Sequence, residues 1–198
     1  MDPKIATDTY KSGSYAKSLF PAFAKGDLSI PEKIERGDKA LYLDLVIKNS
    51  QTGQVNKKAH LMDQTTNVLS HNQSQNDNLI TQISQNSEIE DRAARLNDQA
   101  RPLEDSANKL NTERENVQKE VSTMIETLRS AVKKPIHETK KTLEDLSTKL
   151  QKVDNSIDKF KANADSLDEK QKNLRKNAAD ALAIAGIPVS EKLPKNTG

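Results

Sequence analysis

The sequence predicts an all-α protein, a long antiparallel coiled-coil helical hairpin with a small, partly irregular N-terminal segment. Two observations predict this fold. Apolar residues recur at alternating spacings of three and four through two long segments, the pattern that places one apolar stripe along a helix. The repeat slips by one residue between the segments, at Pro135, where a proline interrupts helix hydrogen bonding.

The first repeat predicts one helix over residues 59–131. Pro102 lies inside it, but the repeat keeps its phase across this proline, so we expect a kink and not a reversing loop. Extended backwards in the same phase, the stripe passes through Val68 and Leu61. Residues of this stripe that follow each other at intervals of seven are Leu96, Leu103, Leu110, Val117, Met124 and Ala131.

Polar residues interrupt this stripe. Between residues 72 and 86 it contains Asn72 and Gln75, and such a stretch gains little from burial. It is therefore expected to be mobile, hydrated or paired through amide hydrogen bonds, and a weak end of the coil is the simplest interpretation. Arg114 also occupies the stripe, and its side chain can extend to a nearby carboxylate such as that of Asp154.

The second repeat predicts a helix over residues 136–185, joined to the first by a turn at residues 132–135. Gly186 is a candidate C-terminal cap, and residues 186–198 are expected to form a flexible tail. The first predicted helix carries seven basic and twelve acidic side chains, a net negative charge. Residues 132–198 carry fourteen basic and ten acidic side chains, a net positive charge. Opposite net charges favour pairing of the two segments. The alternative is a parallel rod, kinked at both prolines, that assembles as a dimer or trimer.

Residues 1–58 differ in composition and are predicted to be an anchor or docking segment, with a locally collapsed lobe as the alternative. Aromatic side chains bury a large area per residue. Apolar residues occupy alternate positions from Leu41 to Ile47, a pattern that favours a strand. Asp38 as an N-terminal cap favours a helix instead, and the helix is our preferred interpretation. The aromatic residues that are candidates for interaction are Tyr10, Tyr15, Phe20 and Phe23.

The composition limits the class of function. Hydrophobic residues make up 33% and charged residues 30% of the chain, too polar for a broad core but sufficient for narrow helical seams. The absence of cysteine removes disulfide and thiolate chemistry. A net charge of +2 argues against a nucleic-acid partner. No 18-residue apolar run or secretory signal is present, so we expect no membrane insertion and a cytoplasmic, virion-associated or non-classically exported protein.

No catalytic, cofactor-binding or metal-binding residues are predicted. The chain contains no HExxH motif, phosphate-binding glycine loop or Ser-His-Asp arrangement. His60 and His71 lie about 16 Å apart on a helix, too far to share a metal. Paired carboxylates occupy outer helix positions, where solvated charge explains them.

These observations predict a non-enzymatic structural or assembly protein that uses its coiled coil as a spacer or oligomerisation element. A virion or tail fibre, or a secretion-system filament or tip component, needs such a part. The expected partners are proteins, as a homo-oligomer or a larger assembly. The alternative is an intracellular adaptor or chaperone that binds helical partners. Further candidate interaction residues are Lys133 and Lys134 at the turn, and Leu182 and Ile184 near the C-terminus.

Overall fold

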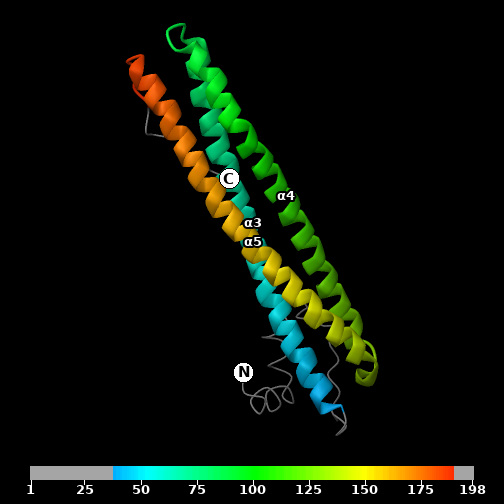
Figure 1. Cartoon of the computed structure of the whole chain (residues 1–198). Coiled ribbons are helices and arrows are strands. Elements are labelled where there is room, and N and C mark those ends of the chain that lie inside the picture. Colours follow the sequence, from blue (N-terminus) through cyan, green and yellow to red (C-terminus); the bar gives the residue numbers. More distant parts are fainter. Residues whose placement is uncertain (1–37, 190–198) are drawn as a thin grey trace. The chain divides into compact units, whose positions relative to one another are not determined.

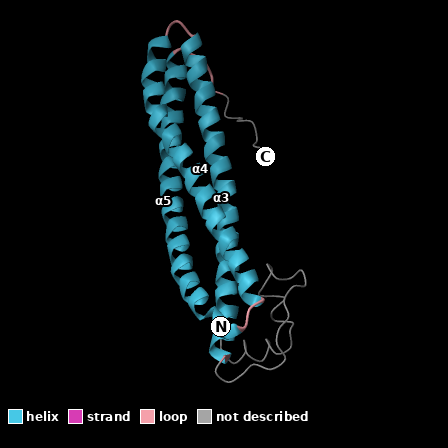
Figure 2. Cartoon of the chain, turned by 90° about the vertical axis from the view of Figure 1, so that its right-hand side faces the viewer, coloured by secondary structure: helices cyan, strands magenta, loops and turns pink. Residues whose placement is uncertain are grey.

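The computed structural model describes residues 38–189, and 91% of these residues are helical, with no strand among them (Figures 1 and 2). The prediction of an all-α fold is confirmed. The number of helices differs, because three long helices replace the two expected ones. They are α3 (Lys39–Gln85), α4 (Glu90–Val132) and α5 (Lys140–Ile184), with the short 3₁₀ helix η1 (Ile136–Thr139) before α5.

A break at residues 86–89 shows that the prediction of one helix over residues 59–131 was wrong. The Asn86 side-chain oxygen accepts a hydrogen bond from the backbone N–H of Glu88 at 2.9 Å, a local bond that competes with helical pairing. The backbone N–H of Ile89 also bonds to the carbonyl of Asn86, at 3.2 Å. Helix α4 then begins with Glu90 and Asp91, whose carboxylates suit the positive end of the helix dipole.

This break also explains an error in the phase of the seam on α3. Continued backwards from α4, the repeat placed Leu61 and Val68 inside, but both are exposed. The buried apolar residues of α3 in this part are instead Ala59, Met62 and Leu69. A heptad repeat keeps its phase only along one continuous helix, and α4 does not continue α3.

Residues 39–58 are helical and continue without a break into the rest of α3. The helical interpretation that began at Asp38 is confirmed, with the Tyr42 N–H bonding to the Asp38 carbonyl at 3.0 Å. The strand interpretation of Leu41 to Ile47 was wrong. Leu45 and Val46 are both buried, as successive residues on the inner side of a helix can be.

The second turn lies where the slip at Pro135 predicts it. Helix α4 ends at Val132, and Pro135 precedes η1 with φ −55° and ψ 136°, extended angles that proline accommodates. Within η1, Ile136 and Thr139 are buried, and the Thr139 hydroxyl donates to the Ile136 carbonyl at 2.6 Å. Pro102 lies inside α4, as the unbroken repeat predicts.

The described chain divides into two compact units, and each long helix contributes to both. The first unit contains residues 38–60 and 116–157, and the second contains residues 61–115 and 158–189. In the first unit, large side chains from all three helices form the core. The most deeply buried are Val46, Val121, Met124, Leu128, Leu143, Leu146 and Val153.

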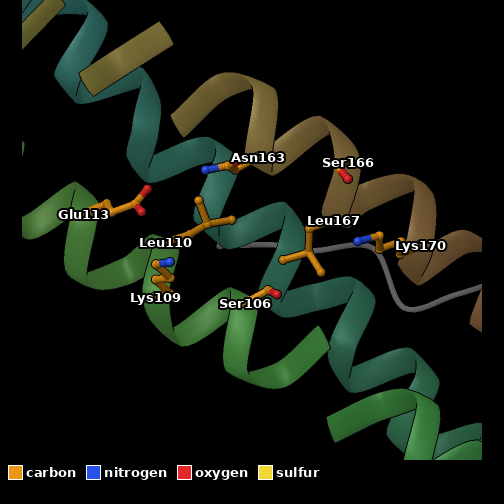
Figure 3. Close-up of a pocket in the computed structure, with 8 residues that line it drawn as sticks. All are labelled: Ser106, Lys109, Leu110, Glu113, Asn163, Ser166, Leu167 and Lys170. Carbon is orange, nitrogen blue, oxygen red and sulfur yellow. The ribbon is translucent and has the colours of Figure 1, made fainter. Parts of the chain in front are cut away.

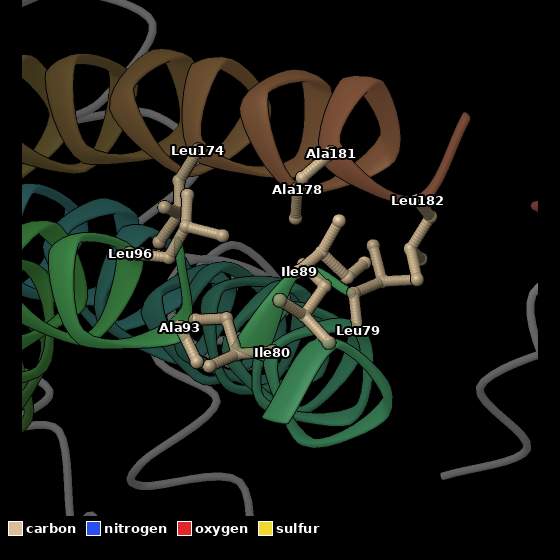
Figure 4. Close-up of a cluster of buried hydrophobic side chains, with 10 residues drawn as sticks. Leu79, Ile80, Ile89, Ala93, Leu96, Leu174, Ala178, Ala181 and Leu182 are labelled. Atoms are coloured by element: carbon tan, nitrogen blue, oxygen red, sulfur yellow. The ribbon is translucent and has the colours of Figure 1, made fainter. Parts of the chain in front are cut away.

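The second unit has its own apolar cluster, contributed by the end of α3, the start of α4 and the end of α5 (Figure 4). Its members include Leu79, Ile80, Ile83, Ile89, Ala93, Leu96, Leu174, Ala178, Ala181 and Leu182. The C-terminus of α5 is closed beside this cluster by Gly186, whose φ of 73° is left-handed. The N–H groups of Gly186 and Ile187 bond back to Ala183 and Leu182 at 3.0 Å, which confirms Gly186 as the cap.

Candidate functional site

The second unit contains a layer of amide side chains buried between α3 and α5, which we call the amide layer: Asn72, Asn76 and Gln171. Gln171 is 1% exposed. Its Oε1 accepts from the Asn72 Nδ2 at 3.0 Å, and its Nε2 donates to the Leu69 carbonyl at 2.9 Å. The Asn76 Nδ2 donates to the Gln171 backbone carbonyl at 3.0 Å. Through its side chain and its backbone carbonyl, Gln171 thus binds residues of two successive turns of α3.

Charged groups continue the amide layer on both sides. The Asn72 Nδ2 also donates to the Asp168 carboxylate at 2.8 Å, and Lys172 contacts the same carboxylate at 2.9 Å. On the other side, the Arg175 Nη1 donates to the Gln75 Oε1 at 2.9 Å. The Gln75 Nε2 lies 2.7 Å from the His71 Nε2. These contacts give the α3–α5 interface polar specificity as well as apolar burial.

The amide layer corrects the expectation of a weak coil end, because Asn72 and Gln75 are buried and hydrogen-bonded inside the chain. A buried amide left without a partner costs about 1–3 kcal/mol, so a helix displaced by one turn would lose stability here. Buried polar residues set register in coiled coils by this effect. The layer therefore favours one register of α3 against α5 over registers displaced by a turn.

Arg114 also has a partner other than the expected one. Its Nη1 donates to the Asp63 carboxylate at 2.8 Å within the second unit. Asp154, the predicted partner, instead accepts from the Lys58 Nζ at 3.0 Å within the first unit. The predicted two-helix hairpin had no separate α3, the helix that supplies both Asp63 and Lys58.

The exposed side of α3 in the second unit forms a surface that we call the α3 outer face: Leu61, Gln64, Asn67 and Val68. Leu61 is 56% and Val68 52% exposed. They are seven residues apart, as on one side of a coiled-coil helix. Farther back on α3, in the first unit, Ile47 is also exposed.

Charge is scarce along this part of α3. Residues 61–85 contain only two acidic and no lysine or arginine side chains, Asp63 and Asp77 being the two acidic ones. Residues 90–115 of α4 contain twelve charged side chains in a stretch of similar length. The surface of α3 is therefore polar but almost uncharged, with exposed leucine and valine.

An open groove of about 200 Å³ lies between α4 and α5 in the second unit (Figure 3). Leu110 and Leu167 line it together with charged and hydroxyl side chains, including Lys109, Glu113 and Lys170. Its lining contains neither histidine nor cysteine. The groove is thus lined by charges of both signs, those of Lys109, Lys170 and Glu113.

Among the residues that the structure describes, Asp77 and Tyr42 have shifted pKa values. Partial burial, together with the negative charge of Glu104, raises the pKa of Asp77 above its ordinary value. Partial burial, together with Asp38, raises the pKa of Tyr42. In residues 38–189 no three His, Asp or Glu side chains gather closely enough to hold a metal ion.

The predicted interaction residues differ in whether their side chains are exposed to a partner. Lys133 and Lys134 are exposed in the turn after α4. Leu182 is fully buried in the apolar cluster, so its side chain is not accessible to a partner, whereas Ile184 is 63% exposed. The other predicted residues lie outside the described part of the chain: Tyr10, Tyr15, Phe20 and Phe23.

Sequence reasoning missed Gln171 and Asn76. Gln171 stands between Leu167 and Leu174 in the stripe of α5, at a position where an apolar residue is expected. A glutamine there, and a run of amides in α3, is the signal that could have predicted an amide layer.

None of the described helices is both long enough and apolar enough to span a bilayer. No protein-family model, curated protein or solved structure matches the chain.

Proposed function

We propose that the protein is a non-enzymatic structural or assembly component whose helices form an antiparallel coiled coil, used as a spacer and oligomerisation element. Contacts within the second unit support the antiparallel arrangement. Asn177 of α5 donates to Gln99 of α4 at 3.3 Å. Farther along α4, Glu113 shares the groove with Asn163 (Figure 3). Residue numbers thus rise along α4 as they fall along α5.

The α3 outer face is the observation that carries the oligomerisation part of the proposal. Leu61 and Val68 repeat at the interval of seven that a second helix can follow, and they are not used in the chain's own seam. Interface cores are depleted of charged residues relative to other protein surfaces. Residues 61–85 match this composition, with only Asp63 and Asp77 bearing an acidic charge.

A second copy of the chain is the partner that this surface fits. Two copies of α3 can approach with little repulsion, because lysine and arginine are absent from residues 61–85. Uncharged Gln64 and Asn67 beside the apolar residues can hydrogen-bond to identical residues across a two-fold interface. The charged surface of α4, with twelve ionisable side chains in residues 90–115, suits solvent better.

Molar mass in solution tests the proposal. The native chain should exceed monomer mass in sedimentation equilibrium, with a mass that rises with concentration. The double variant Leu61→Glu, Val68→Glu should be monomeric with unchanged helical circular dichroism, because it places four like charges in the interface of a dimer. The control Asn155→Glu, Ala162→Glu adds the same charges at the same interval on exposed positions of α5 and should associate normally.

A native chain that stays monomeric at about 1 mM would contradict self-association. That result would favour the adaptor or chaperone alternative, in which the α3 outer face binds the helix of another protein. Leu182 cannot serve that alternative, because it is buried in the chain's own core. Equal association of the native chain and the Leu61→Glu, Val68→Glu variant would place the interface elsewhere.

A further inference from the structure

A second groove between α4 and α5 lies in the first unit and is lined mainly by lysine. Its volume is about 250 Å³. Lys119 comes from α4, and Lys149 and Lys152 come from α5; we call these three the groove lysines. Three positive charges and one negative charge give the lining a net charge of +2. The remaining lining residues are Glu120, Thr123 and Met124.

The groove lysines bring like charges together from two helices. Lys149 and Lys152 are three residues apart, so they lie on one face of α5. Lys119 lines the same groove from α4. Residues that flank the seam of a coiled coil commonly pair with opposite charges on the neighbouring helix. Lysines repel each other instead, so this arrangement favours an anion between the two helices.

Carboxylates close in sequence do not neutralise the groove lysines. Asp154 accepts from Lys58 at 3.0 Å, and Glu126 pairs with Arg129 at 3.0 Å. Among residues 38–189, no carboxylate oxygen lies within 4.0 Å of the Nζ of a groove lysine. The positive charge of the groove is therefore available to a ligand.

The chemistry of the lining defines the class of ligand. The Thr123 hydroxyl donates to the Lys119 carbonyl at 3.0 Å, which leaves the lysine ammonium groups as the donors. Lysine binds phosphate as a point charge. A phosphate monoester carries about −1.5 to −2 charges at pH 7, which matches the net charge of +2 in the lining. Met124 and the carbon stems of the lysines provide apolar contact for a small organic group.

We propose that this groove binds a small phosphate monoester, whose phosphate contacts the groove lysines and whose organic group packs against Met124. The volume of about 250 Å³ suits a ligand smaller than drug-sized molecules, whose sites occupy roughly 300–1,000 Å³. The site uses α4 and α5 of the first unit and no residue of the α3 outer face. The proposal is therefore independent of self-association.

Phenyl phosphate is the probe, and methionine methyl NMR of the native chain locates it. Met124 lines the groove, whereas Met62 is buried in the second unit and serves as a reference. The substitution Met124→Leu assigns the signal. The phenyl ring should shift the Met124 methyl resonance and leave that of Met62 in place, with a dissociation constant on the order of 1 mM. An unchanged Met124 signal, or equal shifts of both signals, at about 10 mM probe would overturn the proposal.

Two further ligands separate the contribution of the phosphate from that of the ring. Phenol lacks the phosphate and should shift the Met124 signal about tenfold less at the same concentration. Inorganic phosphate should displace phenyl phosphate more effectively than sodium chloride does at equal ionic strength. A phenol shift as large as that of phenyl phosphate would overturn the proposal, as would displacement by phosphate no better than by chloride.

A pair of double variants tests the groove lysines. Lys149→Gln, Lys152→Gln should weaken phenyl phosphate binding about tenfold, because it removes two of the three positive charges. The control Lys140→Gln, Lys141→Gln removes the same charge from exposed positions of α5 outside this lining and should bind within about twofold of the native chain. Both variants change exposed side chains and should keep the native helical circular dichroism. Equal weakening in the two variants would reveal attraction to net charge alone and would contradict a site in the groove.

Discussion

Gln171→Ala is the substitution that should reveal the energetic importance of the amide layer. The native side chain accepts from Asn72 and donates to the Leu69 carbonyl, two hydrogen bonds at about 1 kcal/mol each. Because Gln171 is 1% exposed, truncation also leaves a cavity that costs about 1 kcal/mol. We expect the free energy of unfolding to fall by about 3 kcal/mol, and the melting temperature by about 6–12 °C.

Urea unfolding followed by circular dichroism measures this change. The matched control is Gln151→Ala, which makes the same truncation at an exposed position of α5 and should change stability by less than about 0.5 kcal/mol. In a double-mutant cycle, Asn72→Ala and Gln171→Ala should be coupled by about 1 kcal/mol. If Gln171→Ala costs no more than the Gln151→Ala control, the hydrogen-bonded layer does not stabilise the fold.

Three further substitutions test other contacts. Asp63→Asn removes the carboxylate 2.8 Å from Arg114, and urea unfolding should show a loss of about 1 kcal/mol; unchanged stability would mean that the pair is fully screened. Gly186→Ala places a side chain at φ 73° and should cost about 1 kcal/mol in thermal unfolding, whereas an unchanged melting temperature would argue against the left-handed cap. Glu104→Gln removes a charge that raises the pKa of Asp77. With a raised folded-state pKa, the stabilising contribution of Asp77 is present at low pH and is lost as the pH rises through that pKa. Glu104→Gln should thus slightly raise stability at neutral pH and reduce its gain on acidification; lower stability at neutral pH would contradict the repulsion.

Much of α4 and α5 could be predicted because their seams follow one repeat without interruption. Leu110, Val117, Met124, Leu143 and Leu150 are all buried as that repeat predicts. The rule that underlies this success is local: residues three and four apart share a helix face. The slip at Pro135 was equally informative, because proline both marks and causes the interruption.

The first turn was missed because neither glycine nor proline marks it. Asn86 was interpreted as a seam residue, yet its side chain bonds to the backbone of Glu88 and helps to end the helix. The pair of acidic residues that follows, Glu90 and Asp91, is a helix-start signal that could have indicated the break. Once this turn was missed, Leu61 and Val68 were assigned to the inner face of α3.

The amide layer was not predicted because the first turn had been missed. Asn72 and Gln75 lack partners in a two-helix hairpin whose second helix has already ended, so a weak coil end was the natural interpretation. Only when α3 returns beside α5 does Gln171 come within hydrogen-bonding distance of Asn72. Contacts between residues about 100 apart in sequence follow from the number of turns, which local periodicity does not determine.

A single-cysteine cross-link tests the proposed role of the α3 outer face most directly, since the native chain contains no cysteine. Gln64→Cys places one thiol between Leu61 and Val68, and Asn97→Cys places one on an exposed position of α4 as a control. Under mild oxidation at equal concentration, the yield of covalent dimer should be high for Gln64→Cys and low for Asn97→Cys. Equal yields for the two variants, or no dimer from Gln64→Cys, would contradict assembly through α3.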